Sequence, residues 1–485
     1  LVLITPEKLK VLVQFFDGLE ADVDGGRLPI VHSDQVVSVL KNLSQGERLA
    51  KDENLWATTR EWNEGDRQDD GVLVRDVHRP EDIEGLIFSG PHIYHCTPFY
   101  QTPTENSSTH RAYIGIDISD AETDYLPRTI YRLNKDADAY INKVPRWKGR
   151  ELFSRFRHGH RNLVGLAGER TLIPAILPAG AGSIGNVTTM AFESNRDTAL
   201  CTGVSSSLIA DFMIRCAGRD HIFPKDIQRL PSIEGMPEYA EAVVARTSRL
   251  NCMTFHFSEF WRSVFQDSWK SFSFSQAVSS VDTWGNINCD WDRSAPIKTS
   301  FARRLAQVEI DILVAAAVGV TLDQLKEILK TQFTVLCENE KGLLFDAIGQ
   351  SVPTASTVQG NASLNLLQFS KFLEDSVGLD TSARYSEGEK ATNELISKDI
   401  HIPKKFRQFF SGANLVRAED LFGFQRIDAQ SGEILGVKYA FSGCEPFKER
   451  VYPFPWTTVD RARDYERAWE FLAKPISMAT VEMVR

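Results

Sequence analysis

Apolar residues recur at helical spacing in many parts of the chain, and this pattern predicts where its helices lie. We expect helices over residues 5–19, 34–43, 136–143, 151–161, 197–216, 300–318, 322–333, 364–378 and 460–472, and one long or two short helices over 238–265. The segment 300–318 is apolar nearly all round, which predicts a buried helix. Thr321 and Gln324 have the spacing of a capping box at the start of the next helix.

Alternation of apolar and polar residues predicts strands over 55–62 and 111–118, with 72–77 as the next strand after the first of them. Residues 170–177 (apolar, interrupted by Pro174), 187–192 (β-branched) and 422–440 are strand-like as well. Residues 267–296 are rich in Ser, Trp and Asp and are expected to form an irregular surface connection, and 351–361 to form a flexible link. The pattern predicts a mixed α+β fold of several small subdomains, with an irregular β-rich region and helical bundles.

The predicted elements divide the chain into four segments. These are an N-terminal helical segment (1–50), a β-rich domain (51–232), a helical domain (233–350), and a C-terminal α/β segment that starts with the flexible link (351–485). A length of 485 residues fits two to four domains of about 150 residues.

Composition and cysteine usage predict the cellular compartment of the protein. A hydrophobic fraction of 42% is enough for a real core, yet no apolar run approaches the ~18 residues of a membrane span. The first apolar run ends at Glu7, too early for a signal peptide, and the chain begins at Leu1, so we expect a fragment or a processed protein. Seven scattered cysteines with no C-x-x-C pair favour a reducing compartment. We therefore expect a cytoplasmic protein without a membrane partner.

The strongest charge signal lies between Arg146 and Arg170. This stretch holds seven lysines and arginines against two glutamates, a local charge of +5 in a chain with a net charge of -10. Trp147, Phe153 and Phe156 lie among the cations. Positive charge gathered beside aromatic residues is typical of a surface for a polyanion. The alternative is a solvated basic face over a buried aromatic side.

Two other sequence patterns are candidates for a phosphate-binding site and a metal site. Residues 180–185 form a G-x-G-x-x-G, but two prolines precede it and a β-branched segment follows it, so we expect a loop rather than a phosphate cradle at a helix start. His92, His95 and Cys96 are close in sequence. Because residues three apart on a strand face opposite sides, we predict no metal site there.

The motifs of common catalytic mechanisms are absent from the sequence. It holds no Pro-Pro, Pro-Cys or Gly-Lys dipeptide, no E-x-K, D-x-K or H-x-K, and no G-x-S-x-G. We assign no catalytic residue to this chain and leave open whether it belongs to an enzyme.

Several short motifs, taken together in their order, resemble one family. They are SGPH (89–92), TPFYQTP (97–103), YLPRTIY (125–131), PRW (145–147), GERTLIPAILP (168–178), IRCAGRDH (214–221) and RLP (229–231), with further similarity over 309–333 and 458–471. The chain resembles the C-terminal half of the large adenine-specific DNA methylases of bacterial phage defence, which include the fused type IIG restriction–modification enzymes and the DISARM methylase. Residues 352–417 do not align with this pattern.

The resemblance implies a function for each part of such a protein. An N-terminal catalytic domain would bind S-adenosylmethionine and methylate adenine at N6, and the part resembled here would recognise the DNA sequence, with 51–232 as the target-recognition domain. The implied partners are double-stranded DNA, the catalytic domain (in the same polypeptide or a separate subunit) and other defence-complex proteins. We expect no cofactor and no metal in this chain itself.

Cations and amides of the basic stretch are the candidate DNA contacts. Phosphate contacts are expected from Arg146, Lys148, Arg155, Arg157 and Arg161, and base contacts from His158, His160, Asn162 and Arg219. The DNA-binding set also includes Trp147, Arg150, Arg170, His221 and Lys225. Trp147 could pack instead of stacking, Arg170 could brace a loop, and the cations after residue 214 could cap a helix.

A second hypothesis assigns the chain a different class of function. It would be a non-catalytic scaffold that docks partner proteins of a defence complex, with the predicted helices over 300–333 as its interface.

Overall fold

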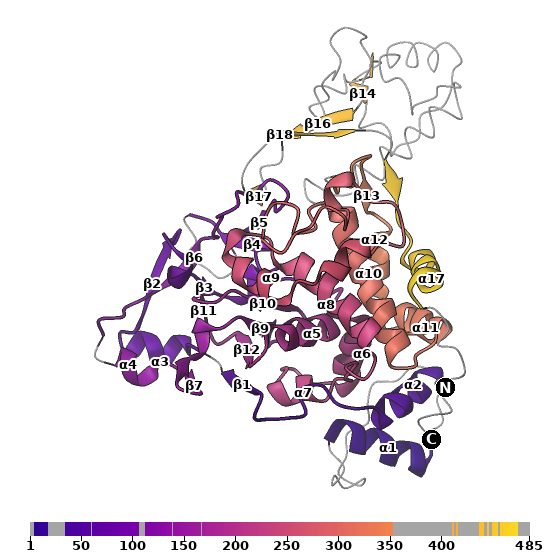
Figure 1. Ribbon diagram of the computed structural model, residues 1–485, viewed down its shortest axis with the longest axis horizontal. Helices are drawn as coiled ribbons and strands as arrows, with labels where there is room; N and C mark the ends of the chain where they lie inside the picture. The colour runs from indigo at the N-terminus through magenta and orange to yellow at the C-terminus, as the bar shows by residue number, and fades with distance from the viewer. Residues whose placement is uncertain are drawn as a thin grey trace. The chain divides into compact units, whose positions relative to one another are not determined.

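The structure of the protein is a computed structural model that describes residues 4–17, 34–59, 61–105, 112–137, 139–165, 167–352 and 456–473, with five short strands between 410 and 453 (Figure 1). It is an α+β protein with several small sheets, which confirms the predicted fold class. The chain forms two compact units. Unit 1 comprises Leu1–Lys298, Arg303–Cys337 and Arg461–Arg485, and unit 2 comprises Thr299–Ala302 and Glu338–Asp460.

Helices make up much of the described chain. In order they are α1 (Pro6–Asp17), α2 (Asp34–Gln45), α3 (Glu64–Asp69), α4 (Tyr140–Lys143), α5 (Asn195–Ser206), α6 (Leu208–Ala217), α7 (Pro224–Gln228), α8 (Pro237–Asn251), α9 (Ser258–Val264), α10 (Ser300–Ala317), α11 (Leu322–Gln332), α12 (Thr334–Glu340) and α17 (Arg461–Leu472). The predicted helix over 364–378 lies outside the described residues. Thr321 and Gln324 do form the predicted capping box of α11.

The strands are short. They are β1 (Trp56–Thr59), β2 (Leu73–His78), β3 (Ile87–Phe88), β4 (Gln101–Pro103), β5 (Tyr113–Ile116), β6 (Thr129–Leu133), β7 (Arg146–Trp147), β8 (Arg150–Glu151), β9 (Arg157–Arg161), β10 (Pro174–Leu177), β11 (Gly182–Ser183), β12 (Val187–Phe192), β13 (Leu344–Phe345), β14 (Phe410–Ser411), β15 (Asn414–Leu415), β16 (Gly436–Ala440), β17 (Cys444–Glu445), β18 (Glu449–Pro453) and β19 (Thr457–Thr458). Of the predicted strand over 422–440, only β16 lies within the described residues.

A four-stranded antiparallel sheet, in the order β1-β12-β9-β10, lies at the centre of unit 1 (Figure 1). Helix α5 packs against three of its strands and also against α8. A side chain at Gly203 of α5 would meet Thr247 Oγ1 at 2.4 Å and Val243 Cγ1 at 2.5 Å. The close approach of α5 and α8 therefore requires glycine at this position.

The predicted helix over 151–161 is wrong. Residues Leu152–Ser154 form one 3₁₀ turn, and Arg157–Arg161 form the inner strand β9. Gly159 weakens a helix, and in the strand it leaves room for Leu177, whose side chain would lie 2.9 Å from an added Cβ. Pairing on both edges of β9 outweighs the local helical pattern.

The predicted helix over 197–216 is two helices. Ser207 has an extended backbone, and its hydroxyl accepts a hydrogen bond from the Ala210 N–H as the cap of α6. The two axes differ by 66°. The segment over 238–265 likewise resolves into α8 and α9. Residues 180–185 contain the two-residue strand β11, which pairs with β3, and lead into β12. The G-x-G-x-x-G motif is therefore not followed by a helix, as predicted.

Unit 2 has a small apolar core of its own. Leu344, Val352 and Tyr452 pack together, with Trp456 against them. Strands β13 and β19 pair, and so do β16 and β18, each antiparallel. The ring of Phe301, at the start of α10, meets Phe345 edge-on at 5.5 Å between centroids.

Candidate functional site

The basic stretch divides into an exposed part and a buried part. The exposed part is the β7–β8 hairpin, residues 146–151, and the buried part is strand β9 with the residues that follow it. The charge pattern of the sequence does not separate these two parts, whereas their surroundings in the fold do.

The β7–β8 hairpin has a two-residue turn of defined conformation. Lys148 has φ +49° and Gly149 has φ +75°, so both central residues are in the left-handed region. This is the geometry of a type I′ turn, whose twist matches that of the two strands. The side chains of Arg146 and Lys148 are 54% and 41% exposed, and Arg150 is exposed as well. The turn therefore presents three cations to solvent.

Trp147 lies between two of the cations of this region. The Lys148 Nζ lies 5.0 Å from the centre of its ring and the Arg155 Cζ lies 4.9 Å from it. Such cation–π contacts hold the cations beside the ring without neutralising them.

Two of the hairpin cations have carboxylate partners. Arg146 pairs with Glu151 at 3.2 Å and Lys148 pairs with Glu193 at 3.0 Å. Exposed ion pairs of this kind contribute only about 0–1 kcal/mol, so a phosphate can replace the carboxylate at small cost. Within the described part of the chain Arg150 forms no ion pair.

Arg157, by contrast, lies in the interior of unit 1. Its Nε lies 2.7 Å from Glu61 Oε1, and both side chains are fully buried. Its two terminal nitrogens donate to the carbonyls of Phe153, Arg155 and Ala181. Burial lowers the pKa of Arg157 and the negative charge of Glu61 opposes this shift. The structure corrects the prediction for Arg157, because a guanidinium enclosed in this way cannot reach a phosphate.

His158 and His160 are buried on the other face of β9. The His158 Nδ1 is 3.1 Å from Thr202 Oγ1 of α5, and its Nε2 is 3.2 Å from His160 Nδ1. Burial lowers the pKa of His160 to about 4 and that of His158 well below its usual value, so both rings are neutral at pH 7. The structure corrects the predicted base contacts of His158 and His160, because both rings are buried and cannot reach a base edge.

Arg161, the last residue of β9, and Asn162, which follows it, donate hydrogen bonds to backbone carbonyls. Asn162 is buried and its Nδ2 donates to the Gly185 carbonyl at 2.7 Å, which corrects its predicted role at a base edge. Arg161 is partly exposed. Its Nε and Nη2 donate to the carbonyls of Gly90 and Ile93.

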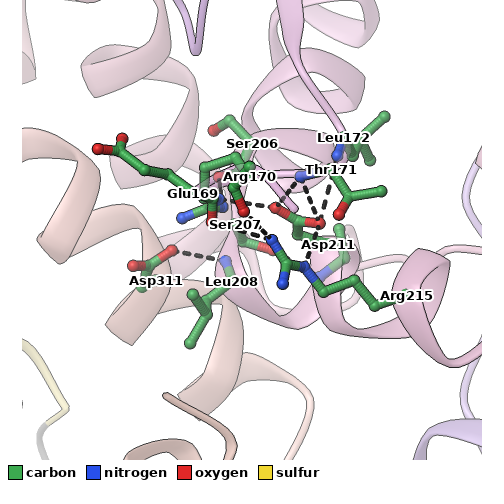
Figure 2. A network of polar contacts seen from close by, with 12 residues as sticks. Glu169, Arg170, Thr171, Leu172, Ser206, Ser207, Leu208, Asp211, Arg215 and Asp311 are labelled. Atoms are coloured by element: carbon green, nitrogen blue, oxygen red, sulfur yellow. Dashed lines mark hydrogen bonds and ion pairs between the residues drawn. The ribbon is translucent and has the colours of Figure 1, made fainter. Parts of the chain in front are cut away.

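Arg170 belongs to a buried network around Asp211 (Figure 2). Its Nε donates to Asp211 Oδ2 at 2.8 Å and its Nη2 to the Ser206 carbonyl at 2.7 Å. Asp211 also accepts from the backbone N–H groups of Thr171 and Leu172, and Arg215 lies 3.6 Å away. Of the two roles considered for Arg170, the structure shows the bracing one.

The last three candidates follow α6: Arg219 and His221 lie on the loop after it, and Lys225 lies in α7. Arg219 is mostly buried and its Nε lies 3.5 Å from Asp226. His221 is partly exposed beside Asp220, and its ring stacks on Phe223 at 6.3 Å between centroids. Lys225 is exposed, with its Nζ 5.9 Å from the centre of the Phe223 ring. His221 and Lys225 are therefore at the surface, apart from the hairpin in sequence.

The two histidines considered for a metal both lie in the interior. His92 Nδ1 accepts from the Ser89 N–H at 2.9 Å, and its Nε2 donates to the Arg128 carbonyl at 2.7 Å. His95 has no hydrogen-bond partner for either ring nitrogen among the described residues. In that same part of the chain, no three His, Cys, Asp or Glu side chains gather as a metal site would require.

An aromatic pair near β9 was missed by the sequence reasoning. The rings of Tyr94 and Tyr100 stack at 4.6 Å between centroids with an angle of 25°, and the Arg161 Cζ lies 5.9 Å from the centre of the Tyr94 ring. The two tyrosines stand out in the sequence only as aromatics six residues apart, and the turn between them brings them together: the Tyr94 N–H donates to the Thr97 carbonyl at 2.9 Å.

No protein-family model matches the chain, and a search of curated proteins also gives no match. Among the described helices none is by itself long and apolar enough to cross a membrane, and the bent pair α5 and α6 meets the criteria only by length and composition.

Proposed function

We propose that this chain is the DNA-recognition part of a site-specific adenine-N6 DNA methyltransferase of a restriction–modification or DISARM-type system. The ordered set of motifs supports the enzyme class. The observation that supports DNA binding is the β7–β8 hairpin, whose three cations are exposed around a tryptophan that holds two cationic neighbours.

The shape of the hairpin suits a groove of double-stranded DNA. A two-stranded β-ribbon fits the major groove, which is about 12 Å wide. Lys148 and Gly149 at the tip are the residues that would enter deepest, and Arg146 and Arg150 flank them on the two strands. Cations at the sides of a ribbon reach the phosphates, and this contact positions the protein without reading sequence.

The remainder of the proposed machinery lies outside this chain. S-adenosylmethionine would bind in the catalytic domain, either upstream in the same polypeptide or in a separate subunit. The protein would act in the cytoplasm, where its DNA substrate and a reducing environment for its cysteines are both found.

Salt-dependent binding to duplex DNA tests the proposal. Each phosphate contact that is lost should lower the slope of log K against log salt by about 0.9, so the variant Arg146→Ala/Lys148→Ala/Arg150→Ala should bind with a slope lower by about 2 to 3. A matched control removes three other exposed cations, Lys135, Arg262 and Lys270, which pair with carboxylates at 2.7–3.0 Å. If both triple variants bind with the same affinity and slope, the hairpin is not the DNA-binding face.

The scaffold hypothesis has one observation in its favour. Phe255 is 59% exposed, and its ring meets Trp291 edge-on at 6.3 Å between centroids. An exposed aromatic pair of this kind suits a protein interface. Co-purification of a partner protein without nucleic acid, together with no binding of any duplex, would favour the scaffold over DNA recognition.

A further inference from the structure

Tyr100 is the more exposed member of the stacked pair of Tyr94 and Tyr100. Tyr100 is 37% exposed, while Tyr94 lies beneath it and is partly buried. The only described ring against Tyr100 is that of Tyr94, at 4.6 Å. The second face of the Tyr100 ring is therefore not occupied by another described aromatic side chain.

The pair is fixed in place by its surroundings. The Tyr94 hydroxyl donates to Glu169 Oε2 at 2.9 Å, and the Tyr100 N–H donates to the His92 carbonyl at 2.8 Å. The Tyr100 carbonyl accepts from Ile116 of β5 at 3.0 Å. The backbone of Tyr100 and the ring on which it stacks are therefore both fixed, so little conformational entropy is lost when a ligand stacks on Tyr100.

Arg161 supplies a positive charge beside the pair. Its Nε and Nη2 donate to backbone carbonyls, and no carboxylate of the described residues forms an ion pair with it. The carbonyl contacts fix the guanidinium without neutralising its charge. The charge of Glu169 also acts on both tyrosines, but among the described residues Arg161 forms no ion pair. A flat aromatic surface next to such a guanidinium is complementary to a nucleobase and its phosphate.

We infer that Tyr100, supported by Tyr94 and Arg161, binds an unpaired nucleobase of a DNA strand by stacking. This inference rests on the proposed function and adds the state of the DNA that this part of the protein binds. In a duplex both faces of each base are covered by its neighbours, so only a base outside the stack can lie on Tyr100. The site is separate in sequence from the β7–β8 hairpin, so the two can be tested independently.

The test compares single-stranded and duplex DNA. The probes are a fluorescein-labelled 12-nucleotide strand, the same strand with one 2-aminopurine, and the duplexes formed from them. Tyr100→Ala should weaken single-strand binding by about 5- to 150-fold, as loss of one base–aromatic stack does. Tyr100→Phe keeps the ring and should bind within twofold of the natural protein. Quenching of the 2-aminopurine emission on binding should disappear in Tyr100→Ala and persist in Tyr100→Phe.

Four outcomes would overturn the inference. Equal single-strand affinity for the natural protein and Tyr100→Ala would do so, and so would equal loss in Tyr100→Ala and Tyr100→Phe. Duplex binding that depends on the hairpin, without any single-strand binding, would refute the stacking site and leave the proposed function standing. If neither form of DNA binds, both proposals fail. Tyr100→Leu, which keeps an apolar side chain but removes the π-face, replaces Tyr100→Ala if that variant melts at a lower temperature.

Discussion

Removal of the Asp211 carboxylate should destabilise unit 1 strongly. Asp211 is fully buried, and its oxygens accept from Arg170 and from two backbone N–H groups at 2.8–3.2 Å (Figure 2). Asp211→Ala leaves the buried Arg170 without its acid, and breaking a buried pair in this way costs about 3–5 kcal/mol. The N–H groups of Thr171 and Leu172 lose their acceptor as well, at about 1–3 kcal/mol for each group that stays unsatisfied.

These costs do not add fully, because the loop over 170–172 relaxes once its anchor is lost. We expect a decrease of about 4–6 kcal/mol in the free energy of unfolding, a large part of the roughly 5–15 kcal/mol of a typical domain. Asp211→Asn keeps one oxygen acceptor and removes the charge, so it should cost less than Asp211→Ala. Arg150→Ala, at an exposed position without an ion pair, is the matched control and should change stability by less than about 0.5 kcal/mol.

Urea unfolding followed by tryptophan fluorescence suits this measurement. Eight of the nine tryptophans lie in unit 1 and only Trp456 lies in unit 2, so the signal reports mainly on unit 1. The midpoint should fall with little change in the m-value. A loss below about 1.5 kcal/mol for Asp211→Ala would refute the reasoning, because it would place the carboxylate in contact with water.

Two further perturbations test the packing around β9. Gly203→Ala should cost about 1–3 kcal/mol in urea unfolding, because its Cβ would meet Thr247 Oγ1 at 2.4 Å, whereas Gly235→Ala, with no atom within 4 Å, should be tolerated; equal effects would contradict the close α5–α8 packing. Burial lowers the pKa of His92 and of His160 from 6.5 to about 4, so their contribution to stability is present above pH 6.5 and is lost as the pH falls toward 4. Protonation of each of these histidines should lower the free energy of unfolding by about 3 kcal/mol at pH 4 relative to pH 7. In His160→Gln the free energy of unfolding should therefore fall by about 3 kcal/mol less between pH 7 and pH 4. An unchanged fall would show that the His160 ring is accessible to water.

The sequence was a good guide to elements whose own pattern is strong. The β-branched segment over 187–192 became β12, the apolar run over 300–318 became α10, and the prolines before 180–185 and the strand after it correctly indicated that no helix starts there. It failed at 151–161, where the strand forms because β10 and β12 pair with both of its edges. That pairing is a long-range contact, and no local sequence pattern predicts it.

The candidate site shows that the sequence alone also does not tell exposed from buried cations. Arg146 and Arg157 look alike in the sequence, yet Arg146 is exposed and Arg157 is enclosed with Glu61, which is 96 residues earlier in the chain. Arginine is suited to both environments, because its five N–H donors can satisfy several buried carbonyls at once. A count of cations therefore overstates the surface available to a polyanion.

A local signal does separate the two parts of the basic stretch. Lys148-Gly149 lies between residues that pair across a two-residue hairpin, and a left-handed turn of this kind belongs at the surface. His158-Gly159-His160, in contrast, places its glycine opposite Ala175 of the neighbouring strand, and the side chain of Leu177 fills the space that a side chain at Gly159 would need. The role of the glycine thus indicates where the polar side chains beside it lie. Beside the glycine of a turn they are exposed and can meet phosphate, whereas beside a glycine required for packing they must find partners inside the protein.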